Sequence, residues 1–179
     1  MAEAFINQVN RAVGIVTSSS NASIGVGLTW MSGISTAHVA INDLVDNANF
    51  IAGTKVTLVG VSSVQLDRAS TNTAAATASN VSFLGPTTSY TSASATKSIL
   101  IGGTFANNTA NSVNLTVTVY DNSTTTESQL ASKIPVPTGS SFVISDAGKT
   151  VLEGDDEVRV YCDVEIAIDV NLSILKGVS

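Results

Sequence analysis

The stretch VNLTVTVY at residues 113–120 alternates apolar and polar side chains without interruption. Because successive side chains of a β-strand point to opposite faces, the apolar positions 113, 115, 117 and 119 share one face of this segment. Such a pattern indicates a strand with one face in a core and the other in water or against a neighbouring molecule. We therefore predict a half-buried β-strand here.

Similar short segments surround this strand from residue 97 to the C-terminus. About seven strands at this spacing, separated by polar turns, are typical of a small antiparallel sandwich with Ig-like or jelly-roll connections. We assign residues 97–179 to this C-terminal β-sandwich domain. The predicted strands around 113–120 are KSILIGGTF (97–105), QLASKI (129–134), SFVIS (141–145), KTVL (149–152), EVRVYC (157–162) and EIAIDVNLSIL (165–175).

The first half of the chain repeats this strand composition and predicts a second small β-sandwich at residues 17–83. The segment LGPTTSYTSASAT, residues 84–96, has no charge and no apolar period, so we interpret it as a linker. The predicted strands of the first domain are SIGVGLTW (23–30), HVAIND (38–43), KVTLVGV (55–61), SVQLD (63–67) and VSFL (81–84).

Residues 1–16 fit neither domain. Phe5, Val9 and Val13 are spaced by four, which suits a helix only in part, so a short helix and an extended arm are equally compatible. We expect an N-terminal arm or short helix that a neighbouring subunit orders. The prediction is thus an all-β protein of two small antiparallel sandwiches preceded by this arm.

The composition excludes several classes of function. The 179-residue chain is 44% apolar and only 12% charged, with a net charge of -6, so it lacks the basic patch that nucleic-acid binding requires. A single cysteine, Cys162, permits no intrachain disulfide and no thiolate metal cluster. We expect synthesis in a reducing cytoplasm without a secretory signal, and no association with a membrane, because no apolar run is long enough to span one.

His38 is the only histidine, and Ser35 and Asp43 lie close to it in sequence. If residues 36–42 form a strand, nothing directs Ser35 towards the imidazole, and no nucleophile elbow is present. Asp43 and Asp46 resemble a fragment of a calcium loop, but the glycine and the closing glutamate are missing, so an Asx-rich turn is the better interpretation. We predict no catalytic, cofactor-binding or metal-binding residues.

Trp30 is the sole tryptophan and raises the alternative of a sugar-stacking platform, with Tyr90 as a second stacking candidate. The segment GVGLTW, residues 25–30, lacks the third glycine of a dinucleotide fingerprint and lies in a strand context. Carbohydrate sites commonly present several aromatic rings, whereas this chain is 5% aromatic. A half-buried Trp30 that anchors the first domain is therefore the favoured interpretation.

The acidic stretch LEGDDEVRVYC, residues 152–162, leads directly into an alternating strand. In an extended chain Asp155 and Glu157 point one way and Asp156 the other, so the three carboxylates do not converge on one ion. We predict that Gly154 and Asp155 form a turn and that the valines at 158 and 160 enter the core. On this interpretation Asp156 is hydrated, and Asp156→Asn changes stability by no more than about 0.5 kcal/mol.

Several of these segments together resemble a domain of virion structural proteins from tailed phages, especially those of marine cyanobacteria. The resemblance rests on a P-x-G-S-S turn at 137–141, the strand segment LEGDDEVRV at 152–160 and a D-V-x-x-S-x-L terminus at 169–175. IAGTKVTLVG at 51–60 is similar to another module of such particles, and the double glycine at 102–103 departs from the pattern. The matching residues are Pro137, Gly139, Ser140, Ser141, Leu152, Gly154, Asp155, Val158, Val160, Asp169, Val170, Ser173 and Leu175.

The resemblance implies a non-enzymatic virion structural protein, assembled in multiple copies as a capsid decoration or a neck or collar component. Its expected location is the virion, after synthesis in the host cytoplasm. Its expected partners are other copies of itself and other capsid, neck or tail proteins, with no nucleic acid, membrane or cofactor. The alternatives are a tail or fibre subunit and a glycan-binding adhesin module; a hydrolase that uses His38 is a third class.

Overall fold

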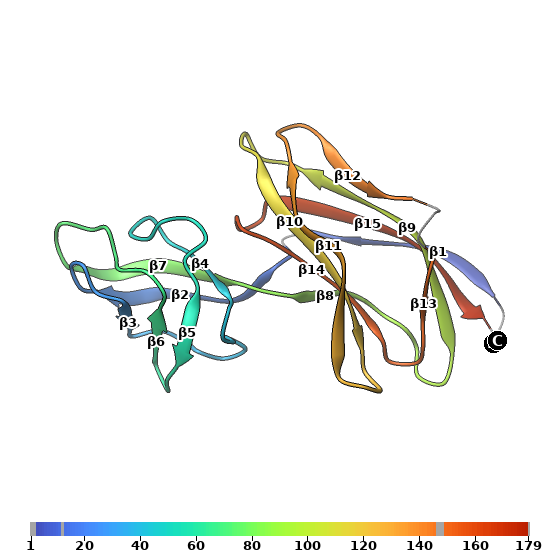
Figure 1. The fold of residues 1–179 in the computed structure, drawn as a ribbon, viewed down its shortest axis with the longest axis horizontal. Coiled ribbons are helices and arrows are strands. Elements are labelled where there is room, and N and C mark those ends of the chain that lie inside the picture. Colours follow the sequence, from blue (N-terminus) through green and yellow to red (C-terminus); the bar gives the residue numbers. More distant parts are fainter. Residues whose placement is uncertain (1–2, 12, 146–148, 179) are drawn as a thin grey trace. The chain divides into compact units, whose positions relative to one another are not determined.

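The computed structural model of the chain describes residues 3–11, 13–145 and 149–178 (Figure 1). Strands make up 59% of the structure, and the described residues contain no helix. Every strand pairing is antiparallel. The predicted all-β antiparallel fold is therefore confirmed.

The chain forms two compact units, and the second is inserted into the sequence of the first. Unit 1 comprises residues 1–13, 86–162 and 166–179, and unit 2 comprises residues 14–85 and 163–165. The predicted order of arm, domain, linker and domain is therefore wrong. The error arises because unit 1 is completed by a pairing between the two ends of the chain, which no local sequence pattern reveals.

Unit 1 consists of two antiparallel sheets, in agreement with a β-sandwich. The first sheet has the order β1-β15-β9-β12, with β13 also paired to β9, and the second has the order β11-β10-β14-β8. The strands of the first are β1 (Ala4–Asn10), β15 (Ile168–Val178), β9 (Lys97–Asn107), β12 (Ser141–Ile144) and β13 (Thr150–Leu152). Those of the second are β11 (Thr126–Val136), β10 (Val113–Asp121), β14 (Glu157–Cys162) and β8 (Thr87–Thr91).

The period-two pattern determines the core of unit 1. Leu115 and Val117 of β10 are fully buried, as are Val158 and Val160 of β14, which confirms the predicted inward face of both strands. The opposite face of β10 is drier than predicted, because Thr116 and Thr118 are also buried. Their direct cross-strand neighbours on β14 are the long side chains of Tyr161 and Arg159, which account for this shielding.

The N-terminal segment is a strand and not a helix or a free arm. All seven residues of β1 pair in an unbroken antiparallel register with β15. The spacing of Phe5 and Val9 by four was ambiguous, because an even separation places two residues on one face of a strand as well as on one face of a helix. Pairing with β15 selects the strand, and this corrects the arm predicted at residues 1–16.

The predicted linker at residues 84–96 also contains a strand. Thr87–Thr91 form β8, which pairs with β14 at the margin of the second sheet. Its sequence TTSYT lacks apolar alternation because an edge strand contributes few side chains to the core. Threonine and tyrosine nevertheless favour extended backbone, so the segment can pair once β14 is in place.

Unit 2 is a single six-stranded sheet with the order β4-β7-β2-β3-β6-β5. Its two outer strands are joined by an isolated bridge between Leu44 and Lys55 and by hydrogen bonds from Val56 N to Asp43 O and from Val45 N to Thr54 O, both 2.9 Å long. The sheet thus curls round its own core. The strands are β2 (Ile15–Ile24), β3 (Trp30–Ser32), β4 (Leu44–Asp46), β5 (Val56–Val59), β6 (Ser63–Leu66) and β7 (Ala76–Leu84).

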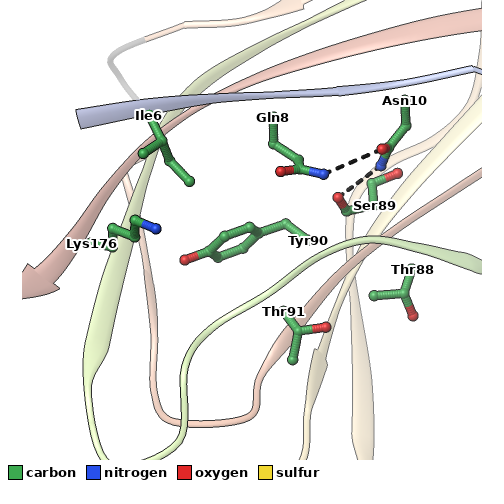
Figure 2. A pocket seen from close by; sticks show the side chains of 8 residues that line it. All are labelled: Ile6, Gln8, Asn10, Thr88, Ser89, Tyr90, Thr91 and Lys176. Carbon is green, nitrogen blue, oxygen red and sulfur yellow. Dashed lines mark hydrogen bonds between the residues drawn. The ribbon is translucent and has the colours of Figure 1, made fainter. Parts of the chain in front are cut away.

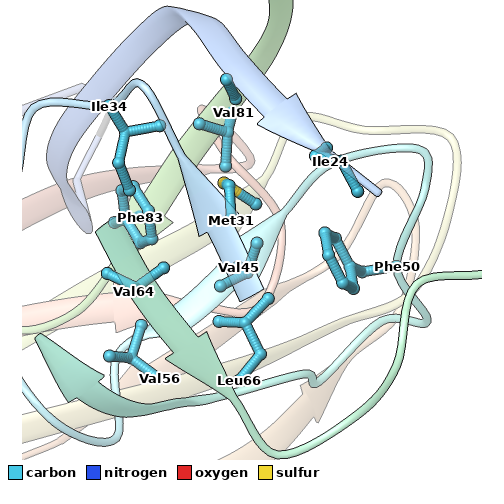
Figure 3. Packing of buried hydrophobic residues seen from close by; sticks show 11 residues of the cluster. Ile24, Met31, Ile34, Val45, Phe50, Val56, Val64, Leu66, Val81 and Phe83 are labelled. Atoms are coloured by element: carbon cyan, nitrogen blue, oxygen red, sulfur yellow. The ribbon is translucent and has the colours of Figure 1, made fainter. Parts of the chain in front are cut away.

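The core of unit 2 collects inward-facing side chains from all six strands (Figure 3). Figure 3 shows Met31 and Val45 in the middle of the cluster, with Phe83 and Val64 on one side of them and Phe50 on the other. The predicted strand at 38–43 is absent: these residues form turns, with hydrogen bonds from Val39 N to Thr36 O and from Asp43 N to Ala40 O. The apolar residues Val39 and Ile41 there mimic a strand pattern.

Candidate functional site

The acidic segment forms a tight turn between β13 and β14. Asp156 N donates a hydrogen bond to Glu153 O at 3.3 Å, and Asp155 has a φ of 69°. Gly154 is required because a Cβ at this position would lie 2.8 Å from Ala95 N. The prediction that Gly154 and Asp155 make the turn is confirmed.

Asp156 is buried, with an exposed fraction of 5%, so the prediction of a hydrated side chain is wrong. One carboxylate oxygen accepts a hydrogen bond from Glu153 N at 2.9 Å, and the other accepts one from Asn122 N at 3.1 Å. The carboxylate thus ties the β13–β14 turn to the hairpin between β10 and β11. A charged acceptor that satisfies two backbone donors contributes substantially to stability, so Asp156→Asn should cost more than the small amount expected for a hydrated side chain.

The other carboxylates of the segment have separate partners. Glu153 forms an ion pair with Lys97 at 2.8 Å, and Glu157 accepts a hydrogen bond from Arg159 Nε at 2.7 Å. Within the described residues, no group of three or more histidine, cysteine, aspartate or glutamate side chains is placed to hold a metal ion. The acidic segment is best explained as a structural turn.

Glu157 and Arg159 belong to a polar network on the outer face of the second sheet. The Arg159 guanidinium lies 3.8 Å above the centre of the Tyr120 ring, and Thr88 Oγ1 donates to Glu157 at 2.7 Å. Burial raises the pKa of Glu157, but the hydrogen bonds from Thr88 and Arg159 and the charge of Arg159 outweigh it and lower the pKa overall. The network satisfies its own charges and stabilises the sheet.

His38, Ser35 and Asp43 do not form a catalytic set. His38 is exposed in a turn with a φ of 65°, and within the described part of the chain it makes no hydrogen bond with Ser35 or Asp43. Asp43 is buried and accepts a hydrogen bond from Ala40 N at 2.7 Å. Its carboxylate also lies where a Cβ at Gly85 would overlap it, which explains the glycine at this junction.

Burial of Asp43 predicts a dependence of stability on pH. Burial raises the pKa of this carboxyl above 3.8, although the hydrogen bond from Ala40 lowers it in part. The folded protein therefore holds the proton more tightly than the unfolded chain, and the stability contributed by Asp43 falls as the pH rises through the folded-state pKa. Asp43→Asn cannot ionise and keeps an acceptor for Ala40, so its Tm relative to the wild type should increase with pH.

Thermal melts across the acidic range measure this difference. Asp67→Asn is the matched control, because Asp67 is exposed and likewise accepts one backbone N–H, from Lys55 at 2.8 Å. Parallel Tm curves for the wild type and Asp43→Asn would contradict the assignment.

The Asx-rich turn predicted around Asp43 and Asp46 is present. Asn47 Oδ1 accepts a hydrogen bond from Asn49 N at 2.8 Å, which is an Asx turn. Asp46 accepts a hydrogen bond from Glu165 N at 3.2 Å. Both aspartates are thus engaged with backbone groups of unit 2.

The two aromatic candidates have different environments. Trp30 is 45% exposed and is not part of the core cluster, to which its neighbour Met31 contributes, so the predicted anchoring role of Trp30 is wrong. Gln65 lies directly opposite Trp30 on β6, and Leu58 of β5 lies on the other side of Gln65. Tyr90 is buried and its hydroxyl is hydrogen-bonded to Ser98 Oγ at 2.8 Å, so its ring is not a stacking platform.

An apolar row crosses the outer face of the first sheet of unit 1. Phe5 of β1 lies opposite Leu175 of β15, which lies opposite Ile99 of β9, which lies opposite Val151 of β13. Phe5 and Val151 are well exposed, and Leu175 and Ile99 are half-buried. Contiguous apolar strips on an outer face are common where another molecule binds, so this row is a candidate contact surface. This row was not predicted, because Phe5 was assigned to an arm or short helix and its partner Leu175 lies far away in sequence.

A groove of about 360 Å³ lies between β1 and β8 of unit 1 (Figure 2). Figure 2 shows Ile6, Gln8 and Asn10 pointing from β1 towards β8. Asn10 Nδ2 donates a hydrogen bond to Ser89 O at 2.8 Å and links the two sheets at this margin. The buried Ser89 Oγ has no hydrogen-bond partner in the described structure. The groove is thus lined mainly by polar side chains.

Comparison with protein-family models, curated proteins and solved structures found no match to this chain. The resemblance to phage virion proteins stays a prediction. The part of the chain that the structure describes contains no helix long and apolar enough to cross a membrane.

Proposed function

We propose that this chain is a non-enzymatic structural protein of a tailed-phage virion, assembled in multiple copies as a capsid decoration or as a neck or collar component. The motifs at residues 137–141, 152–160 and 169–175 support the proposal by resemblance. They occupy a turn, a turn with its strand, and the C-terminal strand of unit 1, so the resemblance concerns a fold and a type of particle and not a reaction.

The observation that carries the proposal is the apolar row formed by Phe5, Leu175, Ile99 and Val151. An isolated soluble domain rarely presents an apolar strip on the outer face of a sheet, whereas a subunit of a larger assembly covers such a strip with its neighbours. The low content of charged residues, 12% of the chain, suits extended contacts between subunits because desolvation costs little. Other virion proteins and further copies of this chain are the proposed partners.

Antibody labelling of purified particles tests the location. Antibodies raised against the purified protein should label the head or neck when particles are viewed by electron microscopy. Label along the tail or its fibres would replace the first choice with the tail or fibre alternative. Absence of label from intact and gently disrupted particles, under conditions where the antibody binds the free protein, would contradict the proposal.

Trp30 favours one second candidate, a glycan-binding adhesin module. Its exposed ring lies beside Gln65 and Leu58, a combination of stacking surface and amide that suits a sugar. On this alternative, Trp30→Ala abolishes binding to host-surface glycan on an array, and Leu58→Ala, the control on the same face, weakens it less. An array without any binding by the wild type would exclude the alternative.

A further inference from the structure

The strand at the edge of a sheet has unpaired backbone groups that can recruit another strand. Natural proteins commonly block sheet edges with bulges, prolines, charges or short strands. In unit 1, β11 is interrupted by two register shifts against β10 and carries Lys133, with a φ of 50°, and Pro135. The sheet edge beyond β9 consists of two short strands, β12 of four residues and β13 of three. The edges at β11 and at β12 and β13 are therefore blocked.

The edge of the second sheet at β8 is also blocked. Its register against β14 shifts between Val158 and Arg159, which leaves Ser89 as the extra residue of a bulge. The carbonyl of Ser89 already accepts a hydrogen bond from Asn10. In unit 2 the two outermost strands are joined by the bridge between Leu44 and Lys55 and by the backbone hydrogen bonds beside it. Unit 2 therefore has no long unpaired sheet edge.

β1 has none of these blocking features. Its seven residues, AFINQVN, pair with β15 without a register shift, contain no charge and no proline, and pair with no other strand among the described residues. Phe5 is 76% exposed and Val9 is 63% exposed, both on the outer face. Such a strand is a template for pairing with another chain.

The sequence of β1 is complementary to itself. If two copies pair antiparallel about Asn7, all seven residues are paired, and Phe5 of each copy lies opposite Val9 of the other on the outer face. Shifting the register by two residues shortens the ladder and places Phe5 opposite Asn7 or Arg11. A shift by one residue would put outer-face side chains opposite inner-face side chains. Maximum overlap and apolar matching therefore coincide in one register.

We propose that β1 pairs antiparallel with β1 of a second copy of this chain, with Asn7 opposite Asn7, so that the first sheets of two unit 1 sandwiches form one continuous sheet. The pairing is isologous, because the same seven residues serve both copies. In the dimer the apolar row is extended across the two-fold axis by Val9 of the second copy. The inference goes beyond the proposed function and does not depend on membership of a particle.

A cysteine cross-link tests both the partner and the register. Asn7→Cys should form a disulfide-linked dimer under mild oxidation, because opposite residues of an antiparallel pair lie within reach of a disulfide. Phe5→Cys alone should not, since the two Phe5 positions would be about 14 Å apart, beyond that reach. The double variant Phe5→Cys/Val9→Cys should cross-link. The native Cys162 is buried and gives little background.

Light scattering coupled to size exclusion tests the dimer itself. The wild type should be a dimer at about 100 µM, where a dimer with a micromolar Kd is largely assembled. Phe5→Lys should shift it to a monomer with an unchanged circular dichroism spectrum. Val143→Lys, the control, alters another exposed apolar residue on the same sheet but away from β1 and should stay dimeric.

Three results would overturn the pairing: a monomeric wild type at this concentration, a closed trimer, or cross-linking through Phe5→Cys but not through Asn7→Cys. If the protein is monomeric but antibodies still detect it on particles, the β1 pairing is rejected and the proposed function stands. If the protein is a dimer but is absent from particles, the proposed function is rejected and the β1 pairing stands.

Discussion

Asp156→Ala should lower the free energy of unfolding of unit 1 by about 2–4 kcal/mol, because two backbone donors lose a charged acceptor in a buried site. The donors are Glu153 N and Asn122 N, which lie 2.9 and 3.1 Å from the two carboxylate oxygens. Asp156→Asn should have a smaller effect, since one amide oxygen remains as an acceptor while the amide N–H₂ faces a donor. Urea unfolding followed by circular dichroism measures both.

The neighbouring residue supplies the control for this prediction. Asp155→Asn removes the same charge from an exposed position, and asparagine tolerates the φ of 69° found there. Its midpoint should therefore stay close to that of the wild type. If Asp156→Ala and Asp155→Asn unfold at the same urea concentration as the wild type, the carboxylate of Asp156 does not support the turn. A rise in Tm with calcium that Asp155→Ala abolishes would show instead that the turn binds a metal ion.

Asn107→Ala should cost unit 1 a comparable amount, about 2–4 kcal/mol, since it leaves buried backbone groups unsatisfied. The buried amide uses its full capacity of four hydrogen bonds. Nδ2 donates to Asn111 O at 2.7 Å and to Val136 O at 2.9 Å, and Oδ1 accepts from Thr109 N and Thr109 Oγ1 at 2.8 Å each. The side chain thereby joins the end of β9 to the β9–β10 loop and the end of β11.

Asn108→Ala is the matched control for Asn107. Asn108 is exposed, and its side chain makes one long contact, 3.5 Å, with Asp169. Equal midpoints for the two alanine variants would contradict the role given to Asn107. Asn107→Asp should be at least as harmful as the alanine variant, because a carboxylate oxygen would then face the carbonyls of Asn111 and Val136.

The sequence predicted those parts of the fold that local alternation determines. VNLTVTVY and EVRVYC became β10 and β14 with the expected faces inward, because each carries its own apolar face. The sequence pattern did not predict β8, because an edge strand needs little apolar surface. The turns at residues 38–43 were read as a strand because Val39 and Ile41 mimic the period of two.

Long-range pairing was beyond local patterns. Ala4 pairs with Lys176, at the opposite end of the sequence, so β1 could be recognised as a strand only through its partner. Both candidate surfaces depend on the pairing of β1 with β15. This pairing places Phe5 in the apolar row and makes β1 an uninterrupted edge strand. Burial of Asp156 was missed for the same reason, since one of its two donors, Asn122, belongs to a distant hairpin.

Quantitative mass spectrometry of gradient-purified particles tests the central claim, membership of a virion in multiple copies, most directly. The account predicts that the protein sediments with the particles, resists a salt wash, and is present at several copies per particle in a fixed ratio to the major capsid protein. Recovery of the protein only in the soluble fraction of the lysate, or a ratio that varies between preparations, would contradict it.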